Sequence, residues 1–258
     1  MLKVCVLATS SAGNCTFVGT DRTRILIDAG VSRIQIRQKL AAIGESLDAV
    51  DAIFITHEHS DHVSGLCALT RKTKAPVFLT HRTAPAMDWG ETPVPTIELF
   101  QAGTAICYRD LEIQSFTVPH DSVDPVGFTV RGGGFKVGLA MDLGYLPDSV
   151  KYHLRGSHLL VLESNHDLEM LKVGPYPWSV KQRVMGRKGH LSNDVVSDYI
   201  AHDLDGDAQT LLLGHLSEHN NHPEIVRLVA SMALEGRGSR TRLVVAEPRK
   251  QSEVFVFA

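Results

Sequence analysis

Five side chains able to bind a metal ion or to carry a proton lie within six residues of the chain: His57, Glu58, His59, Asp61 and His62. Imidazole nitrogen and carboxylate oxygen together suit zinc and other borderline divalent ions. In an extended segment the i, i+2 spacing of His57 and His59 points both rings to one side, which leaves Asp61 and His62 able to turn toward a second ion. The H-x-H-x-D-H pattern therefore predicts a metal site. A histidine cluster on a surface loop is the alternative.

The segments around this motif indicate how it is held. Residues 50–55 form an apolar run broken only by Asp51, which predicts a buried strand. Residues 63–73 predict a helix. The ligands are therefore expected on the turn that leaves a strand and enters a helix.

Three later polar residues, His120, Asp142 and His215, each directly follow a strand-like run. Strand ends at one edge of a sheet are where rigid scaffolds hold functional groups. One such residue alone is most often structural, but three after a strong motif favour metal ligands. Asp28 also closes a strand, and spacing does not decide whether it is a turn residue or a group that orients a metal-bound histidine.

The remaining pattern predicts a mixed α/β chain. The expected strands are 2–8, 15–19, 23–28, 50–55, 76–79, 105–108, 111–118, 126–130, 135–141, 159–162, 210–213, 242–246 and 254–257. The expected helices are 32–43, 63–73, 192–204 and 223–234, with a weak one at 81–89 and a loop at 90–95. Strands lead each half and helices follow, which predicts a four-layer αββα sandwich. No linker or repeat divides the chain, so we expect one domain over residues 1–258.

Composition limits the functions to consider. The 258 residues are 43% hydrophobic and 21% charged with a net charge of −3, as in a soluble globular protein without general affinity for nucleic acid or anionic membranes. A nucleic-acid substrate would need a local basic patch. The best candidate is the stretch 172–188, which a solvated helix face would resemble. Its cations are Lys172, Lys181, Arg183, Arg187 and Lys188.

The four cysteines are widely scattered and form no C-x-x-C pair, which predicts a reducing compartment and no disulfide framework. We expect Cys5 and Cys67 in the core. Neither a signal peptide nor an apolar run of about 20 residues is visible, so a cytosolic location without a membrane span is expected.

The order H-x-H-x-D-H, His120, Asp142, His215 resembles the metallo-β-lactamase superfamily. The resemblance implies two divalent ions, Zn or Mn. It assigns His57, His59 and His120 to one ion. It assigns Asp61, His62 and His215 to the other, with Asp142 bridging both and Asp28 behind them.

Further segments narrow the resemblance to the YycJ-like (VicX/WalJ) branch, which implies DNA 5′-exonuclease or phosphodiesterase activity. These segments are 10–14, 119–121, 163–167, 174–178, 189–193 and 215–217. No cysteine stands at a matched ligand position, which argues against β-lactam hydrolysis. A small-molecule hydrolase of thioesters, lactones or cyclic phosphodiesters, or a non-catalytic regulatory protein, remains open.

Two neighbouring divalent ions can make a shared water nucleophilic near neutral pH and neutralise a phosphodiester's charge. A catalytic role is expected for Asp61, Glu163 and His190. Glu163 ends a strand and His190 precedes a helix; a carboxylate-oriented imidazole can protonate a leaving alkoxide. The pair resembles that of tRNase Z-type phosphodiesterases. The alternative is that the two side chains do not touch.

Substrate contacts are predicted from the same segments: Ser11, Asn14, Asn165, His166, Tyr176 and Trp178. The 10–14 loop offers backbone amides for phosphate oxygen. The two aromatic side chains are expected either to stack on a base or to pack in the core. His166 is expected to approach the metals or the substrate, or to be structural.

Overall fold

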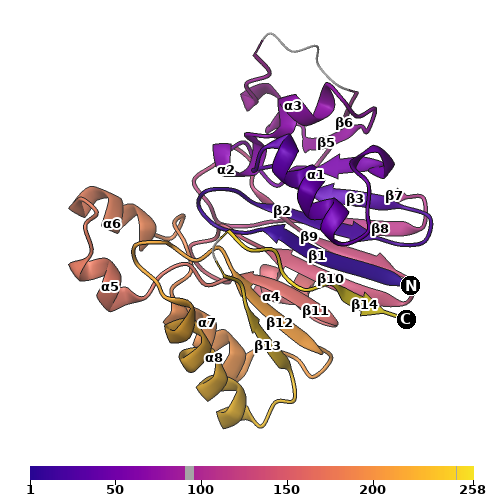
Figure 1. Ribbon diagram of the computed structural model, residues 1–258. Coiled ribbons are helices and arrows are strands. Elements are labelled where there is room, and N and C mark those ends of the chain that lie inside the picture. Colours follow the sequence, from indigo (N-terminus) through magenta and orange to yellow (C-terminus); the bar gives the residue numbers. More distant parts are fainter. Residues whose placement is uncertain (91–95, 248) are drawn as a thin grey trace.

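The apolar runs of both halves form strands in the computed structural model, which describes residues 1–90, 96–247 and 249–258 (Figure 1). The strands pair into two seven-stranded sheets. Sheet A has the order β14-β1-β2-β3-β4-β5-β6, with bounds β14 Phe255–Phe257, β1 Leu2–Ala8, β2 Cys15–Gly19, β3 Arg24–Ile27, β4 Ala52–Phe54, β5 Val77–Thr80 and β6 Ile97–Phe100. Sheet B has the order β13-β12-β11-β10-β9-β8-β7, with bounds β13 Arg242–Val245, β12 Thr210–Gly214, β11 Leu159–Glu163, β10 Phe135–Ala140, β9 Val126–Gly132, β8 Leu111–Thr117 and β7 Ala105–Tyr108.

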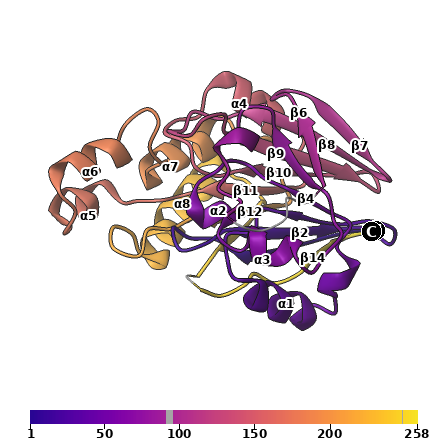
Figure 2. The ribbon, with the colours of Figure 1, turned by 90° about the horizontal axis from the view of Figure 1, so that it is seen from above.

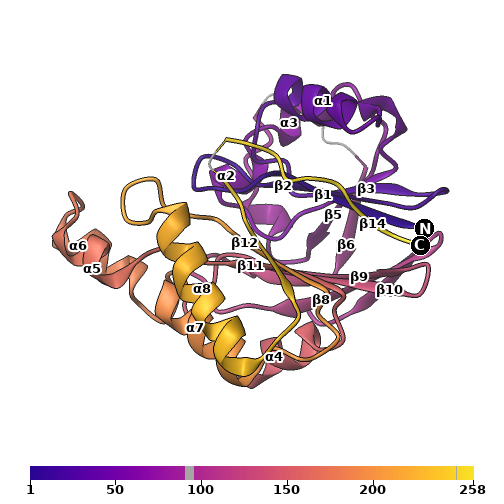
Figure 3. The same ribbon diagram turned by 60° about the horizontal axis from the view of Figure 1, so that its bottom comes forward.

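The helices cover the outer faces of the two sheets, as Figure 3 shows. On sheet A lie α1 Arg33–Ala42 and α3 Leu66–Thr70; on sheet B lie α4 Asp148–Leu154, α7 Asn193–His202 and α8 Pro223–Arg237. The predicted four-layer αββα class is therefore confirmed. The assignment of residues 1–258 to one domain stays a prediction.

A third pair of helices stands apart from these layers. α5 Leu168–Val173 and α6 Trp178–Val184 project beyond the sandwich in all three ribbon views (Figures 1, 2 and 3). We call residues 168–184 the arm. The sequence pattern did not predict these two helices, nor α4 or β6, because all four are short.

Each sheet has an antiparallel half and a parallel half. β3, β4, β5 and β6 run parallel, as do β10, β11, β12 and β13. The carboxyl ends of these strands, and of β1 and β8, meet at one edge of the sandwich. In open α/β sheets this edge is where sites form.

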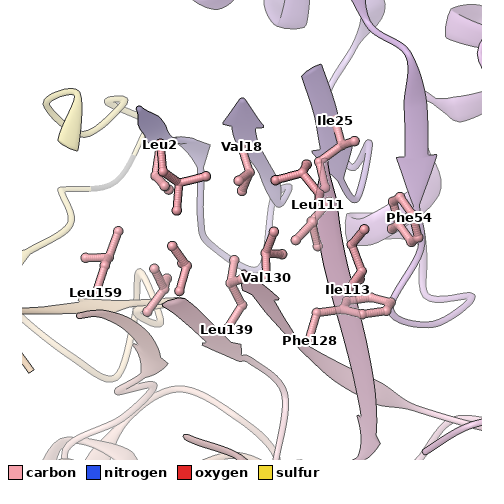
Figure 4. Packing of buried hydrophobic residues seen from close by; sticks show 14 of the residues in the cluster. Leu2, Val18, Ile25, Phe54, Leu111, Ile113, Phe128, Val130, Leu139 and Leu159 are labelled. Carbon is pink, nitrogen blue, oxygen red and sulfur yellow. The ribbon is translucent and has the colours of Figure 1, made fainter. Parts of the chain in front are cut away.

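Three apolar clusters hold the layers together. The central one lies between the sheets, where side chains such as Ile25, Phe54, Ile113 and Phe128 face one another (Figure 4). The ring of Phe54 stacks on Phe78 with centroids 4.4 Å apart. The other clusters pack the helices onto the outer faces. Burial on both faces explains why the central strands read as continuous apolar runs.

The predicted helix 63–73 is wrong, because two short helices stand there, α2 Ser60–Val63 and α3. The break falls at Gly65, where a Cβ atom would lie 1.9 Å from the carbonyl oxygen of Val31. The predicted helix at 81–89 is also wrong and reduces to a 3₁₀ turn, Ala84–Ala86. The strand expected at 50–55 is shorter, as β4. Of the expected loop 90–95, residues 91–95 lie outside the described residues.

Cys5 and Cys15 are buried, Cys67 is half-buried rather than in the core, and Cys107 is exposed; all four are free thiols. Among the described residues no helix is long and apolar enough to cross a membrane. The cytosolic location stays a prediction.

Candidate metal centre

The predicted ligands come together at the carboxyl edge of the two sheets. His57, His59 and His120 form one group, and Asp61, His62, Asp142 and His215 form a second, with the ligand atoms of each group within 4.8 Å of one another. The first group joins the turns after β4 and β8, and the second adds the turns after β10 and β12. Segments as far apart as residues 57 and 215 therefore meet at one site.

In the first group each imidazole leaves one nitrogen for an ion. The Nδ1 atom of His57 lies 3.0 Å from the Thr56 hydroxyl, and its buried Nε2 has no hydrogen-bond partner. His120 donates from Nδ1 to the carbonyl oxygen of Gly189 at 3.2 Å, so its Nε2 faces Nδ1 of His59 at 3.2 Å. Burial lowers the pKa of His57 and of His120, which keeps both rings neutral. Neutral imidazoles with converging lone pairs are suited to a metal ion.

The second group is held from behind by Asp28. Its Oδ2 accepts a hydrogen bond from His62 Nδ1 at 2.7 Å, which directs His62 Nε2 toward Asp142 Oδ2, also at 2.7 Å. Burial opposes charge on His62, yet Asp28 and Asp142 raise the pKa of His62 well above its usual value. Burial likewise opposes charge on Asp142, but His215 and His62 hold the pKa of Asp142 well below its usual value. The Asp28 contact matches the orienting role that spacing left open.

Glu163 is fully buried and engages both of its oxygens. Oε1 accepts from His190 Nδ1 and from His215 Nδ1, each at 2.7 Å. Oε2 accepts from the backbone amides of Leu143 and Leu191, each at 3.1 Å. Burial raises the pKa of Glu163, but the two histidines outweigh it and bring the value to about 2. One carboxylate thus orients a predicted metal ligand and the predicted acid together.

His190 has geometry for two roles. It joins Asp142, Glu163 and His215 in a third group whose ligand atoms lie within 4.8 Å of one another. Because its Nδ1 is committed to Glu163, only Nε2 is available to a substrate or an ion. Burial opposes charge on His190, yet Glu163 raises the pKa of His190 above its usual value, as a proton donor needs.

Three residues of the centre have left-handed backbones. Asp28, Asp142 and His215 have φ of 62°, 53° and 57°; Asp28 and His215 directly follow β3 and β12, and Asp142 lies two residues after β10. Non-glycine residues rarely take this conformation, and it gathers at functional sites. The sharp turn lets the chain leave the sheet at once while the side chain stays in the site.

Two of the predicted substrate contacts bond to the ligand residues themselves. The buried Asn14 amide lies 3.2 Å from Asp61 Oδ2 and 3.1 Å from His62 Nε2. Asn165 donates to the carbonyl oxygen of His215 at 2.9 Å. Both amides are buried and bonded to ligand residues, so they support the site, and a contact with substrate stays a prediction.

The other predicted contacts differ in exposure. Ser11 is exposed on its loop, and Trp178 is 62% exposed on the arm, so core packing is wrong for Trp178. The ring of Tyr176 lies 5.8 Å from that of His219. His166 is 1% exposed, yet its Nδ1 lacks a hydrogen-bond partner, and burial lowers the pKa of His166 to about 4. Buried polar atoms are rarely unpaired, so His166 is the strongest remaining candidate for a substrate contact.

The basic stretch offers fewer free cations than its composition suggests. Lys172 pairs with Glu169, and the buried Lys181 donates to the Lys172 carbonyl. Arg183 pairs with Asp121, next to His120, and Arg187 lies over the Tyr145 ring at 4.4 Å. Much of this charge therefore anchors the arm.

Sequence reasoning missed Thr56, Asp121 and Gly189. Thr56 directly precedes His57, and its hydroxyl lies within 3.2 Å of Asp28, His57 and His62. Gly189 acts through a backbone carbonyl, which leaves no side-chain signal in a sequence. The available clues were the positions of Thr56 beside His57 and of Asp121 beside His120.

A comparison with known families agrees with this geometry. Residues 23–215 match the model of the beta-lactamase superfamily domain. The chain belongs to the metallo-β-lactamase superfamily. It is 36% identical over 239 residues to exodeoxyribonuclease YycJ of Bacillus anthracis, covering 92% of this chain and 90% of the relative.

Another relative and a solved structure are also similar to this chain over most of its length. Exodeoxyribonuclease WalJ of Streptococcus pneumoniae is 34% identical over 230 residues, covering 88% of this chain and 86% of the relative. The crystal structure of the metallo-beta-lactamase fold protein YhfI from Bacillus subtilis superposes with a TM-score of 0.74 at 17% identity, covering 98% of each chain. The predicted family, enzyme class and fold are thereby confirmed: the chain is a hydrolase of the metallo-β-lactamase fold with clusters able to bind metal ions.

Proposed function

We propose that this chain is a dinuclear metal-dependent phosphodiesterase that removes nucleotides from DNA ends. The observation that carries the proposal is the Glu163–His190 pair, which lies beside the second ligand group with an Nδ1 to Oε1 distance of 2.7 Å. The alkoxide released from a phosphodiester is a poor leaving group and needs a proton. A carboxylate-held imidazole with a raised pKa supplies one.

The donor set fits two divalent ions. The unpartnered Nε2 of His57 and the two groups of converging nitrogen and oxygen atoms are what such ions require. When bound, the ions would supply a hydroxide nucleophile and neutralise phosphate charge. Asp142 would be a ligand to both ions, which would be zinc or manganese.

The chain's own residues then divide the remaining work. Asp28 and Glu163 hold His62 and His215 with their Nε2 atoms inward. His190 protonates the leaving oxygen from its free Nε2. Asp61, whose side chain is 21% exposed, and His190, at 20%, mark the side from which substrate approaches, because most other ligands are buried.

The projecting arm supports a polymeric substrate over a small one. α5 and α6 project beyond the sandwich (Figures 1 and 3), and Arg183 at the end of α6 pairs with Asp121, next to His120. Trp178 presents an exposed ring there on which a base can stack. The named exodeoxyribonuclease relatives, alike over most of their length, support DNA as that substrate.

A pair of substrates with different leaving groups tests the role of His190. In His190→Asn we expect hydrolysis of end-labelled duplex DNA to fall by about 10²- to 10⁴-fold. Hydrolysis of thymidine 5′-(p-nitrophenyl phosphate) should fall less than about 10-fold, because p-nitrophenolate leaves without a proton. His202→Asn, an exposed histidine on α7, is the matched control.

Equal losses on both substrates, with less bound metal, would make His190 a ligand and not the acid. If wild-type protein with Mn²⁺ or Zn²⁺ releases no nucleotides from DNA and His59→Ala behaves the same, the nuclease proposal itself is refuted. A panel of lactones and thioesters in that assay would then identify the small-molecule alternative.

A further inference from the structure

A hollow lies next to the metal centre, and none of the predicted metal ligands is among its described lining residues. It has a volume of about 480 Å³, within the range of small-molecule sites. Its walls are the loop after β1, one face of α1 and the segment before β14. The side chains that matter are Ser10, Ser32, Gln35, Lys39, Ser64 and Arg249. We call this hollow the Lys39 pocket.

The charge in the pocket has one sign. Lys39 and Arg249 line it, and none of the described lining residues is an aspartate or a glutamate. Lys39 is half-buried, and in the described parts of the chain its ammonium group makes no ion pair, only a 3.4 Å contact with the Arg249 carbonyl. Arg249 forms a 3.4 Å ion pair with Glu218. The Arg249 side chain is 81% exposed, and ion pairs this exposed contribute little free energy.

A half-buried ammonium without an anion is unfavourable, because burial removes water that nothing replaces. Burial accordingly lowers the pKa of Lys39. Ser32, Gln35 and Lys39 stand on one face of α1 at helical spacing, so they reach the same space. The Ser32 hydroxyl already donates to the Gln35 side-chain oxygen in the α1 capping box, and the Ser64 hydroxyl donates to the Gly30 carbonyl. The Gln35 NH₂ group and the Ser10 hydroxyl line the hollow with the two cations, and such donors suit an anion with several oxygen atoms.

One layer of residues separates the pocket from the metal centre. Asn14 directly follows Gly13 of the pocket wall, and its amide lies 3.2 Å from Asp61 Oδ2. Gly30, also in the wall, packs against Asp61 so closely that a Cβ atom would lie 1.6 Å from its carbonyl oxygen. Thr9, a third wall residue, accepts a hydrogen bond from the His215 amide at 2.8 Å, so the pocket and the metal centre share this layer of residues.

We infer that the Lys39 pocket binds the phosphate of a terminal nucleotide while the neighbouring phosphodiester lies at the metal centre. The inference rests on the proposed function for the position of the cleaved bond. It makes the terminal phosphate a determinant of substrate choice. The same phosphate chemistry occurs at 5′ ends, at 3′ ends and in free mononucleotides, and the test separates these sources.

Binding is measured first, without reference to turnover. Deoxythymidine 5′-monophosphate, deoxythymidine 3′-monophosphate and thymidine are titrated calorimetrically into metal-loaded wild-type protein and into Lys39→Gln/Arg249→Gln. We expect the double variant to bind the preferred monophosphate at least about 10-fold more weakly, with thymidine unchanged. Arg33→Gln/Arg37→Gln is the control, because it removes two charges from the same helix outside the pocket. Circular dichroism spectra confirm that both variants fold.

End preference is measured next, on duplexes that carry 5′-phosphate, 3′-phosphate or hydroxyl ends only. Wild-type protein should degrade one phosphorylated end at least about 10-fold faster than the hydroxyl end. Lys39→Gln/Arg249→Gln should lose that ratio while its rate on hydroxyl ends stays within about twofold.

Three results overturn the inference. They are equal monophosphate affinity in wild type and pocket variant, an equal loss of affinity in the control pair, and an unchanged end preference in the pocket variant. If no DNA is hydrolysed by wild-type protein, the nuclease proposal fails while the titrations still decide whether the pocket binds phosphate.

Discussion

Asp28→Asn provides a direct test of how the second ligand group is organised. Asp28 is 4% exposed. Its Oδ2 accepts a hydrogen bond from His62 Nδ1 at 2.7 Å, and its Oδ1 accepts one from the Thr56 amide at 2.8 Å. Asparagine has nearly the same shape and tolerates the left-handed backbone at this position, where φ is 62°. The substitution therefore changes hydrogen bonding with little change in backbone strain.

Asparagine cannot satisfy both partners, because one of its two terminal atoms is a donor. If the NH₂ group faces Thr56, it meets another N–H donor. If it faces His62, the Nδ1 atom must accept, so the ring proton moves to Nε2 and blocks the atom aimed at the ion. Loss of such an orienting partner weakens metal binding by about 10- to 100-fold. That factor corresponds to about 1.4 to 2.7 kcal/mol.

The assay is metal content by mass spectrometry after equilibration with graded chelator. We expect Asp28→Asn to lose one ion at about 10- to 100-fold lower chelator activity than wild type while it retains the other at the three-histidine group. Asp110→Asn is the control, since this carboxylate accepts from the hydroxyls of Thr20 and Thr23 and belongs to none of the ligand groups. Equal retention of both ions by Asp28→Asn and wild type would refute the reasoning.

Two further predictions concern packing and pH. Gly30→Ala should lower the free energy of unfolding by about 1 to 3 kcal/mol and weaken metal binding, because its Cβ atom would meet the Asp61 backbone at 1.6 Å. Gly236→Ala, in α8 with open space around it, should raise the free energy of unfolding by about 0.5 to 1 kcal/mol, and urea titration would contradict us if both lowered it. Burial raises the pKa of Glu45, but Lys3 at 2.8 Å and Arg24 at 2.9 Å bring it below the usual value. The Glu45 carboxylate therefore stabilises the folded state at pH values above its pKa in the unfolded chain, about 4.3. This stabilisation is lost as pH falls through the lowered pKa of the folded state. Glu45→Gln should lower stability by about 1 kcal/mol at pH 7 and by almost nothing at pH 3, and an equal effect at both pH values would count against this ion pair.

The sequence predicts the sandwich well because burial patterns are local. Continuous apolar runs such as 159–163 become strands covered on both faces, and Ser32 and Ser192 begin helices where capping chemistry places them. Short elements such as the arm's helices were not predicted, because a single turn or two carries too little periodicity. The split near Gly65 depends on Val31, a contact between segments that no local pattern records.

In the metal centre, too, local sequence patterns predict some features, while contacts between distant segments determine others. Residue type and strand-end position brought together the seven predicted ligands, which the structure places in two groups. The pattern did not show that Asn14 and Asn165 face inward as supports. That outcome depends on which loop lies against which, as does the sharing of Glu163 between His190 and His215.

The left-handed residues connect the fold to the chemistry. Asp28, Asp142 and His215 each bear a strained backbone at a strand end, at a cost of order 1 to 3 kcal/mol each. Extended strands direct alternate side chains above and below the sheet, so a polar residue in register would enter the apolar core or the outer helical layer. A left-handed residue within two positions of the strand end avoids both and returns the side chain to the edge where the loops converge. The strain is retained because the apolar layers fix the strand ends, and the site thereby gains ligands that are already aligned before an ion arrives.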